Sequence, residues 1–332
     1  MSYALLILVA LGSPPSSSNS KATSAEVSMA PVASLEIQAN TKINSDSQTP
    51  NQAPEQCQSK ITLNKKSRSL QRNLENAINK THLDKYLKKH RLSIALVDLT
   101  SSKRIYYAGI NDDDMMYAAS LPKIAILLAN AQAADDGRLD WTDEHSRRFF
   151  SMITASSNAD ASWGVEQVSL GSIESVLRDP RYCLYDNEHG GLWIGRKYAH
   201  SSETYRDPKN GLIHGATARQ AARFYTMLNQ EKLVSKVWSD RMLSLMGPPK
   251  HHHKFVRGLA DRQNIQFVAR KSGTWKVWHS DSALIRHGDN LYVAVAISET
   301  RHGDEIMQKI IRILDDLVMN GKHRRQRRPS RV

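Results

Sequence analysis

A serine and a lysine three residues apart open an apolar stretch of the chain and could form a nucleophile and its base. The segment reads Ala118-Ala119-Ser120-Leu121-Pro122-Lys123, and residues 124–131 continue it as an almost wholly apolar helix. Residues three apart share a helix face, so Ser120 and Lys123 are expected to point the same way. Burial would lower the pKa of the lysine and leave a neutral amine to take the serine proton. The alternative is a capping serine beside a solvent-directed lysine.

Two later segments carry groups that suit the same chemistry. Ser156-Ser157-Asn158 lies between predicted helices and could present a hydroxyl and an amide to a cleft, although a plain turn has the same composition. Lys271-Ser272-Gly273-Thr274 ends a predicted strand, where glycine lets a ligand approach the backbone. There the lysine could attract a carboxylate and the Thr274 N–H could donate to an oxyanion. The alternative is an ordinary strand with an edge lysine.

The elements that must position these residues follow from the apolar patterning. A helical repeat is expected from Leu70, strands over five segments, and a final apolar-faced helix that stops at Gly321. The predicted strands are residues 92–99, 104–108, 267–275, 280–286 and 291–298. The two ends of the chain can therefore build one antiparallel sheet with terminal helices packed on it. The middle, residues 120–245, is expected to be mostly helix and loop and to form a second lobe, with a site in the cleft between the lobes.

In this order and in these contexts, the three segments resemble the S-x-x-K, S-D-N and K-T-G motifs of the class A β-lactamases and penicillin-binding serine transferases. The likeness covers about residues 70–320 and includes Thr217–Phe224, which looks like the helix start after the family's omega loop. It implies an α/β fold of the α+β type, β-lactamase/transpeptidase-like. In that fold an antiparallel sheet is flanked by terminal helices and carries an inserted helical lobe.

The resemblance implies a role for each matching residue. Ser120 would be the acylated nucleophile, Lys123 its base, and Ser156 a proton relay to the leaving nitrogen. The implied substrate-binding residues are Asn158, Lys271, Ser272 and Thr274. The backbone N–H groups of Ser120 and Thr274 would form the oxyanion hole, where each donor contributes about 3 kcal/mol. The resemblance implies no metal and no cofactor.

The chain departs from the family pattern in three places. Ser157 replaces the aspartate of the second motif, and Ser120 and Ser156 are only 36 residues apart, which predicts a trimmed helical lobe. The E-x-E-L-N stretch that carries the family's deacylating glutamate is missing, and Glu203 is the nearest candidate for that base. A solvated loop acid explains Glu203 as well. If Glu203 holds no hydrolytic water, the acyl-enzyme would be released slowly.

Composition sets the broad class. The chain has 332 residues, 40% hydrophobic and 24% charged, as in ordinary soluble proteins, which excludes a mainly disordered chain, a collagen-like fibre and a polytopic membrane protein. Lys+Arg 46 against Asp+Glu 33 gives +13. Six of the basic residues lie in the last eleven positions. No nucleic-acid-reading motif is present, so nucleic acid is not an expected partner.

Four segments are expected along the chain: a signal peptide (1–12), a Ser/Asn/Pro-rich linker (13–68), the catalytic domain (69–320) and a basic tail (321–332). The apolar run 4–11 is too short to span a bilayer and fits the core of an export signal, although no positive residue precedes it. We therefore expect an exported monomer, periplasmic or extracellular. The tail could be a flexible end or could contact an anionic envelope or membrane. Whether Cys57 and Cys183 pair stays open, and the histidines 251–253 are expected to be inert toward metals.

The sequence therefore predicts a serine hydrolase that acts on β-lactams or related amides through a Ser120 acyl-enzyme. One alternative keeps the fold and changes the substrate: a peptidoglycan D,D-peptidase or an esterase with slow deacylation. The other is a non-catalytic module that binds penicillin or cell wall in the same cleft.

Overall fold

The computed structural model describes residue 61, residues 63–199 and residues 203–324. The predicted signal peptide, almost all of the linker, Cys57 and the tail residues 325–332 lie outside the described residues. Cys183 is disulfide-bonded. No helix in the described part of the chain combines the length and the apolar character that crossing a membrane requires.

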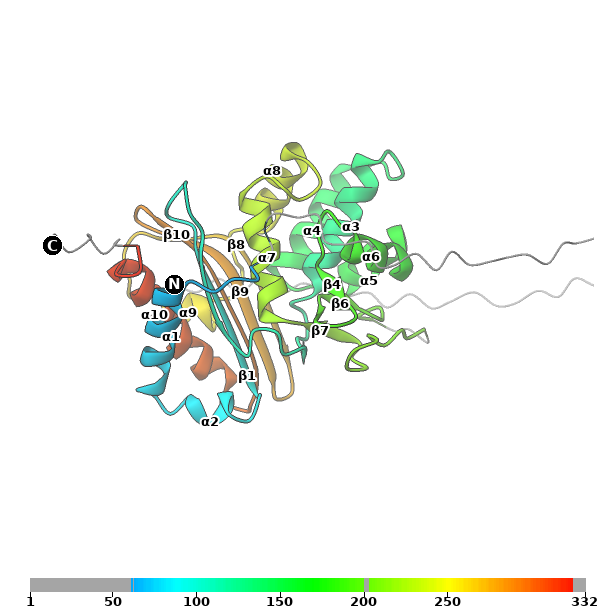
Figure 1. The fold of residues 1–332 in the computed structure, drawn as a ribbon. Coiled ribbons are helices and arrows are strands. Elements are labelled where there is room, and N and C mark those ends of the chain that lie inside the picture. The colour runs from blue at the N-terminus through cyan, green and yellow to red at the C-terminus, as the bar shows by residue number, and fades with distance from the viewer. Residues whose placement is uncertain (1–60, 62, 200–202, 325–332) are drawn as a thin grey trace, which may run out of the picture. The chain divides into compact units, whose positions relative to one another are not determined.

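A five-stranded antiparallel sheet joins the two ends of the chain in the order β2-β1-β10-β9-β8 (Figure 1). Strand β1 (Leu92–Asp98) pairs along its whole length with β10 (Asn290–Glu299). The complete sheet therefore forms only when the two ends of the domain come together. The outer strands are β2 (Tyr106–Ile110), β8 (Ile265–Trp275) and β9 (Trp278–His287). The predicted antiparallel sheet is therefore confirmed, with β2 beginning two residues later than expected.

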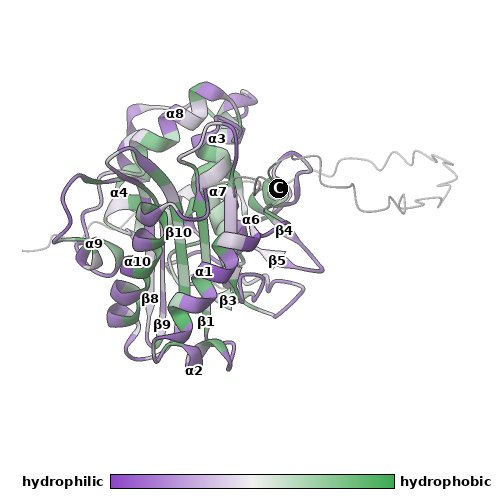
Figure 2. Ribbon diagram, turned by 60° about the vertical axis from the view of Figure 1, so that its left-hand side comes forward, coloured by the Kyte–Doolittle hydropathy of each residue, from purple (hydrophilic) through white to green (hydrophobic). Residues whose placement is uncertain are grey.

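Strand β1 is buried on both faces because helices cover both sides of the sheet. Its Ile94 and Leu96 pack with one apolar cluster, and its Ala95 and Val97 pack with the other. Helices α1 (Arg68–Asn79) and α10 (Gly303–Asn320) cover the first side, together with the short helices α2 (Asp84–Leu87) and α9 (Phe255–Gly258). Figure 2 shows α1 and α10 as mixtures of hydrophobic and hydrophilic segments, as expected for helices with one face on a core.

The inserted lobe covers the second side of the sheet through α7 (Ala218–Asn229), which contacts β1 and β10. Its central helix is α3 (Lys123–Asp135), and every residue of α3 from Lys123 to Ala133 is buried. The surrounding helices are α4 (Asp143–Thr154), α5 (Asn158–Val168), α6 (Leu170–Arg178) and α8 (Lys236–Leu245). Figure 1 shows these helices gathered beside the sheet, as the sequence predicts for the middle of the chain.

The lobe also contains two small sheets that the sequence does not predict. One has the order β3-β7-β6 and the other pairs β4 with β5. Their strands are β3 (Met116–Tyr117), β4 (Tyr185–Asp186), β5 (Gly190–Gly191), β6 (Trp193–Ile194) and β7 (His214–Ala216). Strands of two or three residues are too short to show an alternating pattern. Strand β3 nevertheless matters for the site, because it pairs with β7 and leads directly into the segment that carries Ser120.

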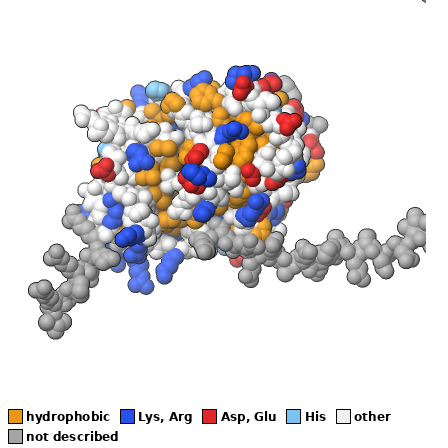
Figure 3. Space-filling view, turned by 90° about the horizontal axis from the view of Figure 1, so that it is seen from above, with side chains coloured by type: hydrophobic (Ala, Val, Ile, Leu, Met, Phe, Trp, Pro, Cys, Tyr) orange, Lys and Arg blue, Asp and Glu red, His pale blue; other side chains and the backbone are white. Residues whose placement is uncertain are grey.

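The upper face of the domain carries mixed charge. Figure 3 shows Lys and Arg side chains interspersed with Asp and Glu side chains, with apolar groups between them. This face therefore presents no continuous field of one sign to a charged partner.

Candidate active site

Ser120 lies in the turn that precedes helix α3 rather than in the helix itself. The helix begins at Lys123, and the turn is built from short-range bonds such as Lys123 N to Ser120 O at 3.3 Å. Ala119 has a left-handed φ of 51°, which an alanine adopts only at an energetic cost. Ser120 and Lys123 therefore do not share a helix face as expected, because the helix begins only after Pro122. The turn still brings Ser120, which is partly exposed, beside a fully buried Lys123.

The ammonium group of Lys123 is held by three neutral oxygens of the second motif. It donates to Ser156 O at 2.7 Å, to Ser157 O at 3.2 Å and to Asn158 Oδ1 at 2.8 Å. Burial lowers the pKa of Lys123 to about 7, although the charge of Asp160 acts in the opposite direction. A large fraction of Lys123 is therefore a neutral amine near neutral pH, and that amine can accept a proton.

Lys271 reaches the same serine from strand β8. Its Nζ donates to Ser156 Oγ at 2.8 Å and to Ser272 O at 2.7 Å. Burial, followed by the charge of Lys123, lowers the pKa of Lys271 well below its ordinary value. Ser156 therefore joins the two lysines, one through its carbonyl and the other through its hydroxyl. Ser157 caps helix α5 instead, because its side chain accepts from Asp160 N at 3.1 Å.

Gly273 presses strand β8 against the turn that carries Ser120. A Cβ at position 273 would lie 2.4 Å from Ala118 O and 2.6 Å from Ser120 N, so any larger residue would force the two segments apart. The Ser280 hydroxyl adds a bond to Ala118 O at 2.8 Å. The close approach at Gly273 therefore brings its neighbour Thr274, which is exposed, near the backbone of Ser120. Ser272 is buried on the same strand.

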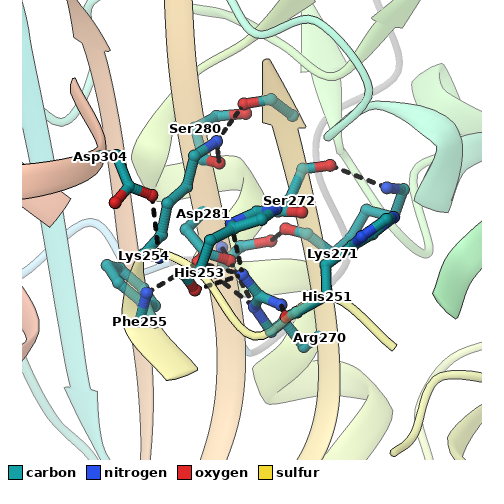
Figure 4. A network of polar contacts seen from close by, with 12 residues as sticks. His251, His253, Lys254, Phe255, Arg270, Lys271, Ser272, Ser280, Asp281 and Asp304 are labelled. Carbon is teal, nitrogen blue, oxygen red and sulfur yellow. Dashed lines mark hydrogen bonds and ion pairs between the residues drawn. The ribbon is translucent and has the colours of Figure 1, made fainter. Parts of the chain in front are cut away.

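A third buried lysine, Lys254, which no sequence motif marks, binds strands β8 and β9 near the third motif. Lys254 Nζ donates to Gly273 O at 2.5 Å, to Thr274 Oγ1 at 2.8 Å and to Ser280 O at 3.0 Å (Figure 4). Burial lowers the pKa of Lys254 to about 8. No local pattern marks this residue in the sequence, because it is a lone lysine after three histidines in a loop.

A buried ion pair links this loop to the sheet. Arg270 Nη2 lies 2.7 Å from Asp281 Oδ2, and both side chains are almost fully buried. The guanidinium also donates to His251 O at 2.7 Å and to His253 O at 3.1 Å, as Figure 4 shows. The loop with histidines 251–253 is thus held against strand β8 by Arg270. Within the described residues, no group of three or more His, Cys, Asp or Glu side chains could hold a metal ion.

The structure does not bring Glu203 to this cluster. Its carboxylate accepts from Tyr205 Oη at 2.6 Å, and it lines a separate hollow of about 560 Å³ together with Glu166 and Trp193. The Lys123 ammonium group, which binds the second motif, is also covered by the ring of Tyr198. The centroid of that ring is 4.5 Å from the Lys123 Nζ. The lining of the hollow that contains Glu203, the candidate deacylating base, includes neither Lys123 nor Lys271.

Comparison with protein families gives one match over most of the chain. A family model described as "Beta-lactamase enzyme family" matches residues 72–148 and 169–320. No curated protein matches the chain.

Many solved structures share the fold at low sequence identity. PBP-A is 16% identical with a TM-score of 0.57, covering 77% of this chain and 98% of that one. A beta-lactamase from Sphaerobacter thermophilus is 14% identical with a TM-score of 0.58, covering 77% and 99%. A variant of the class A beta-lactamase of the last common ancestor of Gram-negative bacteria is 17% identical with a TM-score of 0.56, covering 76% and 99%. These likenesses show the α+β architecture expected from the sequence.

Proposed function

The chain belongs to the beta-lactamase enzyme family, and from this premise we propose that it is a serine hydrolase that forms an acyl-enzyme on Ser120 with β-lactams or related amides. The observation that supports the proposal best is the position of Ser156. Its carbonyl and its hydroxyl bind the ammonium groups of Lys123 and Lys271, and Gly273 holds strand β8 against the Ser120 backbone.

Acylation would begin with neutral Lys123 taking the proton of the Ser120 hydroxyl. The oxygen of Ser120 then attacks the amide carbonyl, and the N–H groups of Ser120 and Thr274 stabilise the oxyanion that forms. When the tetrahedral intermediate collapses, the C–N bond breaks and Ser156 gives its proton to the leaving nitrogen. Lys123, which lies against Ser156, then passes the proton that it took from Ser120 to Ser156, so Lys123 is neutral again and the charge stays balanced. The low pKa of Lys123 supports its role as the base at neutral pH.

Recognition of the substrate would depend on the second and third motifs. Lys271 and Ser272 would bind a carboxylate, as in the β-lactam and D-alanyl peptide classes. Asn158 is exposed and accepts a bond from Lys123 through its amide oxygen, so its amide N–H groups can bind an acyl side chain.

We propose that release of the acyl group is slow. The hydrogen bonds that Lys123 makes within the described residues go to neutral oxygens, and Glu203 lies in another hollow. Fast hydrolysis needs a base that activates water. The chain would then act as a penicillin-binding or D,D-peptidase-type protein more than as an efficient β-lactamase. One structural neighbour, a PBP-A mutant, is titled as an acyl-enzyme complex with penicillin G.

An exported location suits this substrate class, and the apolar run 4–11 supports it. The start of the basic tail is attached to the domain, because Arg324 pairs with the buried Asp98 at 2.7 Å. We propose that the remaining arginines of the tail contact an anionic envelope or membrane surface.

A labelling experiment tests the proposed function. Wild-type protein and the variants Ser120→Ala and Ser175→Ala are incubated with a fluorescent penicillin and separated on a denaturing gel. We expect stable labelling of the wild type and of Ser175→Ala, a control on the surface of α6, and no labelling of Ser120→Ala. A chromogenic cephalosporin assay on the same samples measures turnover. Absence of both labelling and turnover in the wild type would favour the non-catalytic binding module.

A further inference from the structure

We infer that Tyr198 is a positioning residue that sets the lifetime of the acyl-enzyme, because its ring fills the flank of Lys123 where a hydrolytic water would have to lie. This inference depends on the proposed function, since it presupposes an acyl group on Ser120. Tyr198 lies outside the three motifs, and no periodic pattern in the sequence marks it. It follows β6 in the segment that leads to residues 200–202.

The ring of Tyr198 is held on three sides. Its hydroxyl donates to Ala119 O at 2.9 Å, next to the proposed nucleophile. One face lies flat on the ring of His214, with the centroids 4.0 Å apart and the planes 2° from parallel. The Lys123 Nζ lies 4.5 Å from the ring centroid. His214 is itself fixed, because its Nε2 lies 2.9 Å from Arg196 O. The ring therefore cannot move aside without the loss of several contacts.

Neither aromatic group can take over the task of a hydrolytic base. The hydroxyl proton of Tyr198 is committed to Ala119 O, and burial raises the pKa of Tyr198 well above its ordinary value. Burial lowers the pKa of His214 to about 4, so its imidazole has little affinity for a proton at neutral pH. The space beside Lys123 is thus occupied by an aromatic surface that carries no usable base.

The two parts of the tyrosine side chain serve different ends. The ring excludes water from the flank of Lys123. The hydroxyl fixes the carbonyl of Ala119, whose left-handed backbone sets the position of Ser120. Removal of the hydroxyl alone should therefore slow acylation and leave deacylation nearly unchanged, whereas removal of the whole ring should slow acylation and also speed deacylation. A residue with a merely structural role would not separate the two rates in this way.

Variants of Tyr198 test the inference. Tyr198→Phe, Tyr198→Leu and Tyr198→Ala are compared with Tyr205→Ala, a matched control from the same loop whose side chain is 52% exposed. The rate of labelling by fluorescent penicillin gives acylation, and a chase with excess unlabelled penicillin gives the adduct half-life. We expect the half-life to fall at least about tenfold in Tyr198→Ala and Tyr198→Leu, because water admitted beside Lys123 can use its neutral amine as the base. The half-life should stay within about threefold of wild type in Tyr198→Phe and Tyr205→Ala.

The outcomes separate this inference from the proposed function. An unchanged half-life in Tyr198→Leu or Tyr198→Ala, with labelling and melting temperature retained, would overturn the role of Tyr198 and leave the acyl-enzyme intact. If Tyr198→Ala does not fold, Tyr198→Leu decides the question, since it keeps an apolar side chain but frees space for water. Absence of a label in the wild type would remove the proposed function, and this inference falls with it.

Discussion

Replacement of Gly273 by alanine should slow acylation sharply while leaving most of the fold in place. The new Cβ would lie 2.4 Å from Ala118 O, whereas ordinary contact begins at 3.4 Å, so β8 and the nucleophile turn must separate by about 1 Å. A shift of that size displaces Thr274 relative to the Ser120 N–H. An error of about 1 Å in a reacting geometry costs about 100-fold in rate, which corresponds to about 2.7 kcal/mol. Loss of one oxyanion donor has a similar cost.

The assay for Gly273→Ala is the rate of labelling by fluorescent penicillin, with Gly171→Ala as the control. A Cβ at Gly171 meets nothing within 4 Å in helix α6, so this control should label at the wild-type rate. Labelling of Gly273→Ala within about threefold of wild type would show that the close approach at this glycine does not set the geometry of acylation, because a loss of about 100-fold is expected.

Three further predictions concern charge. The rate of acylation should increase as pH rises through about 7, because Lys123 is protonated below that value and is a neutral amine, able to act as the base, above it. Acylation rates measured from about pH 5 to 9 check the inflection, and a flat profile would contradict it. Asp281→Ala should lower the free energy of unfolding by about 3–5 kcal/mol in urea titration, because it leaves the Arg270 charge buried and unpaired. Glu203→Gln should leave the adduct lifetime unchanged, and a longer lifetime would restore Glu203 as the deacylation base.

The pH prediction depends on the charges that face Lys123 from each neighbouring element. Asp160 on α5 favours the protonated form, and burial disfavours it more strongly. Lys271 on β8 is close enough for its own pKa to be lowered by the charge of Lys123. The inflection expected for acylation is therefore that of Lys123, whose pKa burial lowers to about 7.

The sequence was sufficient to predict the sheet and the convergence of the three motifs. Long apolar strands at both ends of the chain leave few ways to bury them, and β1 pairing with β10 is the result. Within this sheet, strand β8 lies against the turn that carries Ser120. Motif order then predicts which residues meet, as the bonds of Ser156 to Lys123 and Lys271 show.

The groups around the motifs could not be predicted in the same way. Tyr198 and Lys254 reach the site from loops, and a lone residue in a loop has no periodicity that marks its direction. Glu203 illustrates the same limit, because its distance along the chain from Thr217 says nothing about the path of the loop between them. The turn at Ser120 also differs from the predicted helix, since the left-handed Ala119 depends on contacts with β8 and Tyr198 that are distant in sequence.

Mass spectrometry of the protein after reaction with penicillin identifies the residue that is acylated. After proteolysis, we expect one covalent adduct, on the peptide that contains Ser120, and no adduct in Ser120→Ala. An unmodified wild-type chain, or an adduct on any other residue, would show that Ser120 is not the nucleophile.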